Sequence, residues 1–561
     1  MASYVGTEFN DLAKLLFNTI SNLKPEFNPI EYLDAFESMK TNLDKVNFVY
    51  ADIKKYPNVF AKYMKDTKSD ELAFTHIDGG KRKCLVGKYW DALEDFTQSV
   101  AAAESETVLA LGYGHRAECF LKLEMPDKCL EEVERASAGY PKDLIEKLVE
   151  IKTQAESMVP CLSSYYESLP GDDFDNCIRV ERDDKFGTHV VATRDVEVGD
   201  IIMIEEPFTS VLTSDRLTHC HQCQNLCYNP VPCNKCTVAL FCSDSCKNEA
   251  QSYHKYECPI LLTICYRVRC EFAADSSILL ALKIALLTKE CYPQKEMLQL
   301  KDSDKYLVVH FLKSRAMFSR FDIFHQAILT AVIYELLWNY TSFFSGIFAT
   351  SRTSDTFKEI MLVQLQTTLS NVATIYEYVQ KLNYNGTNNF GVGAYSLFSL
   401  FTHSCCANVM KTFHGNKLVL RALNTIKEGE QCFVNRYGLR YDVSSTLDRE
   451  QYFITQKLQK CLCKACEEHW SANLGDVAKI CEDLNIDVIE LGDIVRSVIG
   501  SDVQKARNFL PTLITQLKEC EDLEPQGSAL ALKSLIAHCY VIFGNKKIEC
   551  DKSIAEIGFV P

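Results

Sequence analysis

Eight cysteine and histidine residues within a stretch of 39 residues have the spacing of zinc ligands. The spacing is C-x2-C, C-x2-C, C-x3-C and H-x3-C, and residues two or three positions apart let one turn offer two ligands to one metal ion. Eight such ligands fit two tetrahedral zinc ions. A chance grouping is the alternative in a chain with 26 cysteines, and the regular pairing disfavours it. The eight are Cys220, Cys223, Cys233, Cys236, Cys242, Cys246, His254 and Cys258.

A second metal signal lies far along the chain. Cys461, Cys463 and Cys466 form a C-x-C-x2-C motif, which leaves a tetrahedral zinc one ligand short. Cys405, which follows an apolar run, is the best candidate for the fourth ligand. The alternative is that Cys405 and Cys406 are a buried pair without a function, because free cysteine packs as a small hydrophobic residue.

The composition is that of a globular protein with roughly three to four domains. Hydrophobic residues make up 47% of the 561 residues, and the net charge is −15, which disfavours a nucleic-acid-coating role. Many cysteines without a visible secretory signal indicate a reducing compartment. The apolar stretch 324–348 contains His325, Gln326, Glu335 and Asn339, so we expect a buried helix rather than a membrane span.

Helical periodicity dominates the first 150 residues. Leu12, Leu15, Leu16, Ile20 and Leu23 recur at helical spacing within 1–75. A weak repeat over 79–141, closed by Pro141, resembles tetratricopeptide helical hairpins. A plain helical bundle is the alternative.

The pattern then changes to strands twice. Residues 190–193 and 201–204 lie in short runs rich in Val, Ile and Thr and flank a turn, which predicts a β-meander. Strand signals resume at 391–442, among them 417–422, whereas 260–380 and 472–561 have helical patterns. The sequence therefore predicts a β-rich unit split by the cysteine-rich segment and a helical segment.

Several of these segments together resemble one family, the SET and MYND domain proteins, which are lysine methyltransferases. The cysteine-rich segment resembles a MYND zinc finger. The resemblance also rests on 186–194, on 391–409 with its Ser399-Leu400-Phe401-Thr402-His403-Ser404-Cys405 core, on 417–438 with Glu428-Gly429-Glu430 and Tyr437-Gly438, and on the later cysteines as a post-SET strap. It covers about 177–470 in the family's domain order, and the helical hairpins point to its tetratricopeptide-bearing member.

The resemblance implies an α+β fold in which a split β-rich SET core holds an inserted zinc finger and a helical segment between helical flanks. The expected domains are 1–150 helical and tetratricopeptide-like, 177–215 first SET part, 220–258 MYND finger, 259–380 helical insert, 381–442 second SET part, 443–470 post-SET strap and 471–561 helical.

The resemblance also assigns three structural zinc ions, each held by four ligands. His219, His221 and Cys227 fall outside this pattern. The ligand sets are Cys220, Cys223, Cys242 and Cys246; Cys233, Cys236, His254 and Cys258; and Cys405, Cys461, Cys463 and Cys466.

The implied reaction is transfer of a methyl group from S-adenosylmethionine to a lysine of a protein, possibly a histone. Tyr437 would be catalytic, orienting the lysine amine in an aromatic channel that favours its neutral form. The cofactor contacts would be Gly187, Asn371, Thr402, His403 and Tyr437. Asn371 is equally compatible with a solvated polar residue on a helix.

Several residues depart from the family pattern. Thr402 replaces Asn, His189 replaces the second Gly of G-x-G, and Gln459 stands where relatives often place an aromatic residue. Cys406-Ala407 replaces the usual residue-Pro pair, and Glu430 and Tyr437 are separated by one residue more than usual, which a β-bulge could absorb.

These departures leave open a second function, a zinc-dependent interaction scaffold with a weak or inactive SET core that recruits partners through the MYND finger in transcriptional regulation. Proline-rich peptides would be the partners of the finger. We expect no membrane association, no direct nucleic-acid binding, and a cytoplasmic and nuclear location.

Overall fold

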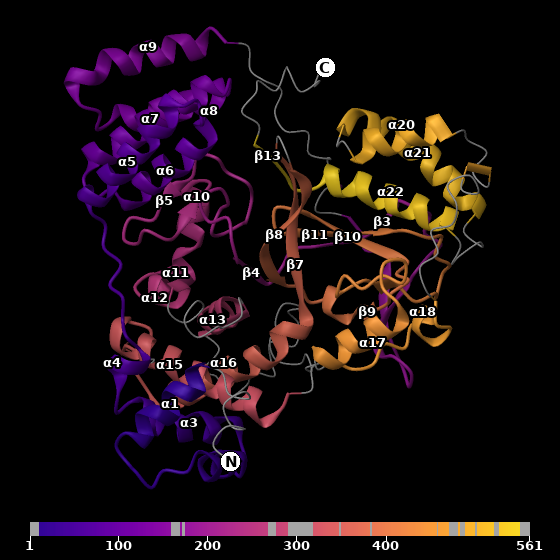
Figure 1. Ribbon diagram of the computed structural model, residues 1–561, viewed down its shortest axis with the longest axis horizontal. Helices are drawn as coiled ribbons and strands as arrows, with labels where there is room; N and C mark the ends of the chain where they lie inside the picture. The colour runs from indigo at the N-terminus through magenta and orange to yellow at the C-terminus, as the bar shows by residue number, and fades with distance from the viewer. Residues whose placement is uncertain are drawn as a thin grey trace.

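A computed structural model of the protein shows two lobes joined by β-strands (Figure 1). One lobe contains the first nine helices and the cysteine-rich segment, and the other contains most of the strands and the last helices. The structure describes residues 11–158, 169–170, 174–266, 277–289, 318–346, 349–381, 384–456, 458–470, 481–482, 488–499, 502–520 and 527–549. This mixed architecture confirms the predicted α+β class.

The helices of the first 150 residues form two groups that pack on different parts of the chain. The first group packs on the long helices α15 (Arg320–Tyr340) and α16 (Ser351–Asn371), where Phe17 stacks on Phe324 with ring centroids 5.5 Å apart. Capping boxes at Thr41 and Ser319 start α3 and α15. The first group is α1 (Asp11–Ser21), α2 (Pro29–Glu37), α3 (Asn42–Ile53) and α4 (Pro57–Phe60).

The second group consists of consecutive helices, each packed on the next, and its tetratricopeptide character stays a prediction. Glycines allow close approach here, since a Cβ on Gly80 would lie 2.5 Å from the Phe96 ring and one on Gly114 would lie 2.4 Å from the Tyr140 ring. This small-against-large packing explains the weak repeat in the sequence. The helices are α5 (Asp70–Leu85), α6 (Tyr89–Ala102), α7 (Glu106–Lys122), α8 (Pro126–Ser137) and α9 (Ile145–Glu156).

The second helical group is fixed to the cysteine-rich segment by buried polar contacts. The Arg116 guanidinium pairs with Glu132 at 2.7 Å and donates to the Pro230 carbonyl at 3.0 Å, with both side chains fully buried. Arg135 donates to the Asn229 carbonyl at 2.7 Å. A buried charge is costly unless it has a partner, so these contacts fix the geometry in which the second helical group docks on the cysteine-rich segment.

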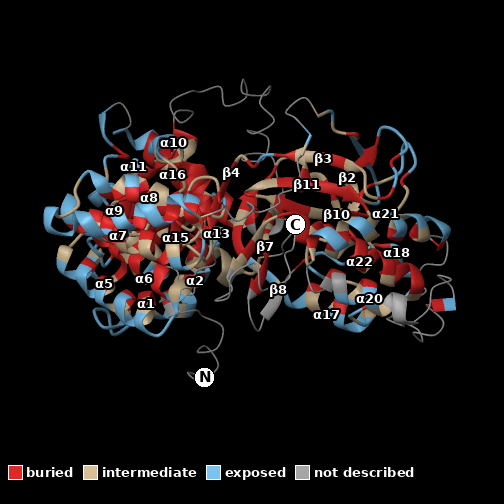
Figure 2. Ribbon diagram, turned by 90° about the horizontal axis from the view of Figure 1, so that it is seen from above, coloured by how far each residue is buried: buried red, intermediate tan, exposed pale blue. Residues whose placement is uncertain are grey.

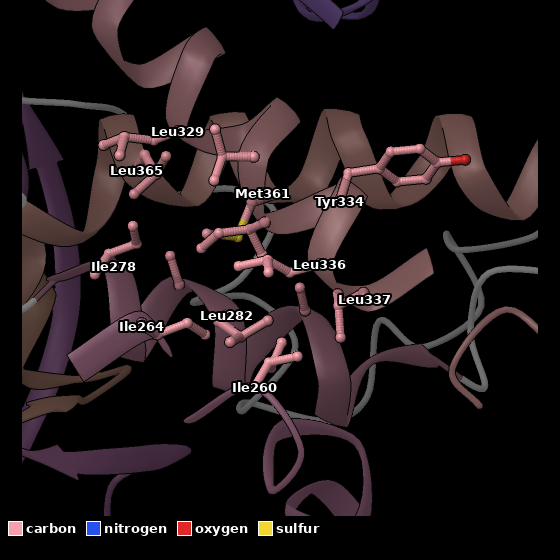
Figure 3. Close-up of a cluster of buried hydrophobic side chains, with 14 of the residues drawn as sticks. Ile260, Ile264, Ile278, Leu282, Leu329, Tyr334, Leu336, Leu337, Met361 and Leu365 are labelled. Atoms are coloured by element: carbon pink, nitrogen blue, oxygen red, sulfur yellow. The ribbon is translucent and has the colours of Figure 1, made fainter. Parts of the chain in front are cut away.

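The apolar stretch that could be mistaken for a membrane span is the core helix of the first lobe. Helix α15 is long and apolar enough to cross a membrane, but 72% of its most apolar window is buried in the molecule. Figure 3 shows Leu336 and Leu337 of this helix near Leu282 of α13 (Ser277–Leu287) and near Ile260, and Leu329 beside Leu365 of α16. The expected buried helix is present, ending at Tyr340 rather than near 348.

The predicted β-meander is wrong. The two predicted strands exist as β2 (Gly187–Ala192) and β3 (Ile201–Glu205), but they do not pair with each other. Instead, β2 forms a hairpin with β1 (Ile178–Asp183), and β3 pairs with β11 (Lys417–Ala422). The alternating pattern locates strands, whereas pairing across more than 200 residues depends on tertiary packing.

The two halves of the β unit meet in a five-stranded sheet in the order β3-β11-β10-β12-β9. In Figure 2, β3, β10 and β11 of this sheet are mostly buried, and exposed residues lie on the outer helices and loops. The remaining strands of this sheet are β9 (Thr402–His403), β10 (Val409–His414) and β12 (Phe433–Val434). The split β-rich core is therefore confirmed.

A second sheet, in the order β13-β7-β8-β4, contains strands that the sequence did not predict. Strand β7 (Val372–Lys381) lies in the segment expected to be helical, and β13 (Lys546–Glu549) lies in the expected helical C-terminal region. The other two strands are β4 (Thr209–Leu212) and β8 (Tyr384–Ala394), and the preceding helices are α20 (Val488–Ile499), α21 (Val503–Cys520) and α22 (Gly527–Phe543).

Candidate active site and metal centres

The two ligand sets of the cysteine-rich segment form two compact clusters. In each set, the four ligand atoms lie within 4.8 Å of one another. A zinc ion with Zn–S bonds of about 2.3 Å in tetrahedral geometry places sulfur atoms about 3.8 Å apart. The Sγ atoms of Cys223 and Cys242 are 3.7 Å apart, and those of Cys233 and Cys258 are 3.9 Å apart. The spacing therefore fits zinc in both clusters.

Glu257 orients the histidine of the second cluster. His254 Nε2 faces the thiol sulfurs of Cys233 and Cys236 at 3.3 and 3.6 Å, and its Nδ1 lies 2.9 Å from Glu257 Oε1. The same carboxylate oxygen lies 2.6 Å from His221 Nε2. A carboxylate behind the ligand is the usual arrangement for a zinc-bound histidine. Sequence reasoning missed Glu257, although its H-x2-E spacing from His254 was visible.

The residues placed outside the zinc pattern have other contacts. His219 Nε2 lies 3.1 Å from Glu377 Oε2 in β7, and its ring stacks on Phe390. Cys227 Sγ lies 3.6 Å from Asn229 Oδ1. The His219 contact connects the cysteine-rich segment to the second sheet, whereas the Cys227 contact lies within the segment.

Cys405 joins the three later cysteines in a third cluster, again with all four sulfurs within 4.8 Å of one another. Its Sγ is 3.7 Å from Cys466 Sγ, and its backbone N–H points to Cys463 Sγ at 3.4 Å. Cys406 lies outside this group and contacts Ser404 Oγ at 3.3 Å. The buried-pair alternative for Cys405 and Cys406 therefore does not describe this site.

A fully buried arginine holds the segment of the third cluster in place. Arg449 lies on α17 (Thr446–Thr455) and donates to the carbonyls of Ser444, Ala465 and Trp470 at 2.6, 3.0 and 3.1 Å. The guanidinium thus connects α17 to α18 (Lys464–Glu467), which carries Cys466. Only a planar, forked group could reach three carbonyls in this way.

Tyr437 lies in a cluster of aromatic rings beside the third cysteine cluster. Its ring centroid is 4.9 Å from His403, 5.6 Å from Phe453 and 6.5 Å from Tyr452. Sequence reasoning missed Tyr452 and Phe453, which come from α17 rather than from a strand motif. Burial, and then Tyr437, raise the pKa of Tyr452, so its hydroxyl stays protonated.

The backbone brings these residues together because β12 runs parallel to both β9 and β10. Asn408 holds these strands together through its side-chain amide. The amide donates a hydrogen bond to the Gln431 carbonyl at 2.9 Å and accepts one from the Phe433 N–H at 2.7 Å. Residues 402–409 thereby lie side by side with residues 431–437, although the two ranges belong to different sequence motifs.

His403 connects Tyr437 to the third cysteine cluster. Its Nδ1 accepts from the Arg436 backbone N–H at 3.1 Å, so a neutral ring carries its proton on Nε2. Nε2 lies 3.5 Å from Cys405 Sγ and can donate to it. The ring that contacts Tyr437 is therefore oriented by a candidate metal ligand.

Gly187 opens the other side of this region. It has φ +67°, a conformation that favours glycine, and a Cβ there would meet no atom within 4 Å. The preceding Phe186 contacts Phe433 with ring centroids 5.6 Å apart. His189 faces the Gly187 carbonyl at 3.0 Å. The start of β2 therefore lies next to β12.

The remaining predicted residues have these positions. Thr402 accepts a hydrogen bond from Gln431 Nε2 at 3.0 Å. Asn371 is buried at the end of α16 and donates to the Thr367 carbonyl at 2.9 Å, so its contact with a cofactor stays a prediction. The extra residue before Tyr437 lies beyond β12, in a bend at 436–438 rather than in a described β-bulge.

A pair of cations lies beneath the 398–401 segment. The Arg436 guanidinium donates to the Phe401 carbonyl at 3.0 Å and lies over the Phe398 ring, with Lys411 Nζ 5.7 Å from the centroid of the same ring. Burial, and then Arg436, lower the pKa of Lys411 to about 8. The Phe398 ring thus lies between two basic side chains, and the pKa of one of them is lowered.

Comparison with known proteins matches the SET domain model to residues 187–438, from the open glycine of β2 to the residue after Tyr437. The chain is 26% identical to protein-lysine N-methyltransferase SMYD4 of Danio rerio over 34% of its length and 30% of that relative's. It is 25% identical to N-lysine methyltransferase SMYD2 of Gallus gallus and 23% identical to histone-lysine N-methyltransferase ASHR1 of Arabidopsis thaliana. These two matches cover 50% and 52% of the chain and 58% and 55% of the relatives.

The matched part of the chain therefore spans between about a third and somewhat more than half of these curated relatives. The three ligand clusters use residues within and just after the segment that the SET domain model matches, and the expected domain bounds stay predictions. The chain thus contains a segment that matches the SET domain, and it is similar to protein-lysine methyltransferases of the SMYD group.

Proposed function

We propose that the protein transfers a methyl group from S-adenosylmethionine to the amine of a lysine in a protein substrate. The main support for this proposal is the cluster of aromatic rings formed by Tyr437, His403, Tyr452 and Phe453. This cluster lies where the 391–409 motif and the 417–438 motif run side by side through β9 and β12. The names of the similar relatives, which are protein-lysine or histone-lysine methyltransferases, support the same substrate class.

The bound cofactor would supply an electrophilic methyl group. The protein must position the lysine amine and keep it neutral, because a protonated amine has no lone pair with which to attack. An aromatic surrounding disfavours the charged form of the amine. The Tyr437 hydroxyl can accept a hydrogen bond from the amine and so direct its lone pair, which is a positioning effect.

The open space at Gly187 and the neighbouring His403 and Thr402 would hold the cofactor. Gly187 lets a ligand approach the backbone, and no side chain fills that position. His403 would contribute through its ring position rather than as a proton donor, since both of its nitrogens face other groups.

We further propose that each of the three ligand clusters binds one zinc ion with a structural role. Each cluster offers four protein ligands, and a closed four-ligand shell is typical of structural zinc. Elemental analysis of the purified protein should give three zinc ions per chain. Replacement of Cys405 by serine should lower this number to two, whereas a Cys129→Ser control should keep three.

The central experiment is a methyl-transfer assay with radiolabelled S-adenosylmethionine and a panel of lysine-containing proteins and histones. Calorimetry with the cofactor should be run on the same preparation. We expect cofactor binding and label incorporation into a substrate. Absence of cofactor binding by a fully zinc-loaded protein would contradict the proposed activity and favour the scaffold function.

A further inference from the structure

Two cysteines outside the metal clusters lie close together in the second helical group. Cys84 is near the end of α5, and Cys119 is near the end of α7. Their Sγ atoms are 3.5 Å apart, and both residues are free thiols. Neither belongs to any of the metal-ligand groups among the described residues.

The two thiols differ in access to solvent. Cys84 is half-buried, whereas Cys119 is fully buried in the core of the helical group. A disulfide requires a sulfur–sulfur distance of about 2.05 Å, so the two sulfurs must approach by about 1.5 Å. The pair therefore has one thiol that an oxidant can reach and a second that can react with the first product.

The electrostatics favour the accessible thiol as the reactive one. The hydrogen bond from Cys119 lowers the pKa of the Cys84 thiol, and the Lys147 ammonium acts in the same direction against burial and Glu118. The hydrogen bond to Cys84 and burial raise the pKa of Cys119. Thiolate character and exposure are the properties that select cysteines for oxidation.

We propose that Cys84 and Cys119 form a redox-sensitive dithiol that hydrogen peroxide converts into a disulfide between α5 and α7. The Cys84 thiolate attacks one peroxide oxygen, the O–O bond breaks, and the other oxygen leaves as water after protonation. Cys119 sulfur then attacks the resulting Cys84 sulfenic acid, the S–O bond breaks, and a second water leaves. Two thiols and one hydrogen peroxide thus give one disulfide and two waters.

The position of this dithiol gives the oxidation a structural consequence. Helix α7 also carries Arg116, one turn before Cys119, which makes the buried contact with Pro230 of the cysteine-rich segment. A covalent bond between α5 and α7 would therefore restrain the helix that docks the helical group onto the finger.

The test treats the zinc-loaded full-length protein with graded hydrogen peroxide, followed by differential alkylation and non-reducing peptide mapping. We expect a peptide pair joined through Cys84 and Cys119, lighter by two hydrogens, to accumulate before zinc is released. Cys84→Ser should abolish this product. A Cys129→Ser control, which changes a buried cysteine of α8, should leave it unchanged.

A second pair of variants tests the roles of the two thiols. Cys119→Ser should leave Cys84 as a sulfenic acid that dimedone traps. Cys119→Ala, which also removes the hydrogen bond, should slow alkylation of Cys84 by up to about tenfold, because the thiolate fraction falls. The proposal is overturned if both cysteines remain alkylatable thiols while the metal-binding cysteines are oxidised, or if Cys84 pairs with another cysteine.

Discussion

At the scale of single residues, the hydroxyl of Tyr437 is the atom on which the proposed chemistry depends. Tyr437→Phe keeps the ring contacts with His403 and Phe453 but removes this hydroxyl. We expect methyl transfer to fall at least about a hundredfold, because a positioning contact of the transition state is lost. A radiolabel assay would measure this, with calorimetry showing cofactor binding within a small factor of the wild type.

The control for this substitution is Tyr266→Phe, which changes an exposed tyrosine in the other lobe. It should have wild-type activity. Full activity of Tyr437→Phe would show that the hydroxyl has no role in the reaction and that the aromatic cluster is only a packing feature.

Residue-level prediction from the sequence succeeded where a local motif fixes the chemistry. The resemblance divided the twelve metal-ligand candidates into three sets of four, and the ligand atoms of each set lie close together in the structure. The C-x2-C spacing by itself indicates only that one turn presents two thiols to one metal ion. Glu257 lies three residues after His254 on α11 (Gln251–Glu257), a spacing visible in the sequence, whereas Tyr452 and Phe453 could not be found in this way, since their roles arise from contacts between α17 and distant segments. Such contacts have no signature at fixed spacing.

At the scale of elements, α17 and α18 form a strap whose position depends on the buried guanidinium of Arg449. Arg449→Lys keeps the charge but cannot reach the carbonyls of Ser444, Ala465 and Trp470 together. We expect a loss of roughly 2–4 kcal/mol in stability, because buried carbonyls lose charged donors. Zinc release to a chromogenic chelator should become faster for one of the three ions.

The matched control is Arg496→Lys, because Arg496 is largely exposed on α20. This variant should release zinc at the wild-type rate. Equal release rates for all three proteins would mean that the strap keeps its position without the forked contact.

The core helix α15 has a pH-dependent contribution to stability. Burial lowers the pKa of His325 from 6.5 to about 4, with Asp322 opposing the shift. Between these values the unfolded chain binds a proton that the native ring does not, so stability falls as the pH falls through this window. This pKa shift can contribute up to about 3 kcal/mol to the free energy of unfolding.

His325→Leu removes this titration. Thermal unfolding midpoints at pH 7.5 and pH 5 should differ less for the variant than for the wild type, although both lose stability as thiol ligands take up protons. The same difference in both proteins would show that the native ring is free to take up its proton near its usual pKa.

Element prediction failed where pairing is set by the whole fold. The strand character of 187–192 and 201–205 follows from Val and Ile content, but their partners lie in the adjacent hairpin and in β11. Strand β7 was hidden because it continues directly from α16 at Val372, without a turn residue to mark the change.

At the scale of the whole molecule, the last described strand connects three distant parts of the chain. Strand β13 follows the C-terminal helices, pairs with β7 in parallel, and contacts the cysteine-rich segment (Figure 1). Tyr228 from that segment donates its hydroxyl to the Ile548 carbonyl at 2.9 Å and accepts from the Ile548 N–H at 3.1 Å. Lys547 adds an ion pair with Asp215 at 3.2 Å.

Tyr228→Phe removes both hydrogen bonds to β13 while the ring can keep its contact with Trp90. We expect a loss of about 1–2 kcal/mol in stability. Amide hydrogen exchange should increase in 546–549 and in the paired part of β7, since local opening of an edge strand becomes easier. Tyr32→Phe is the matched control, because it removes a hydroxyl contact with Asp52 within the first helical group. If exchange at β13 rises equally in both variants, or in neither, the strand is held by its sheet pairing alone, and the finger does not contribute to the position of the C-terminal helices.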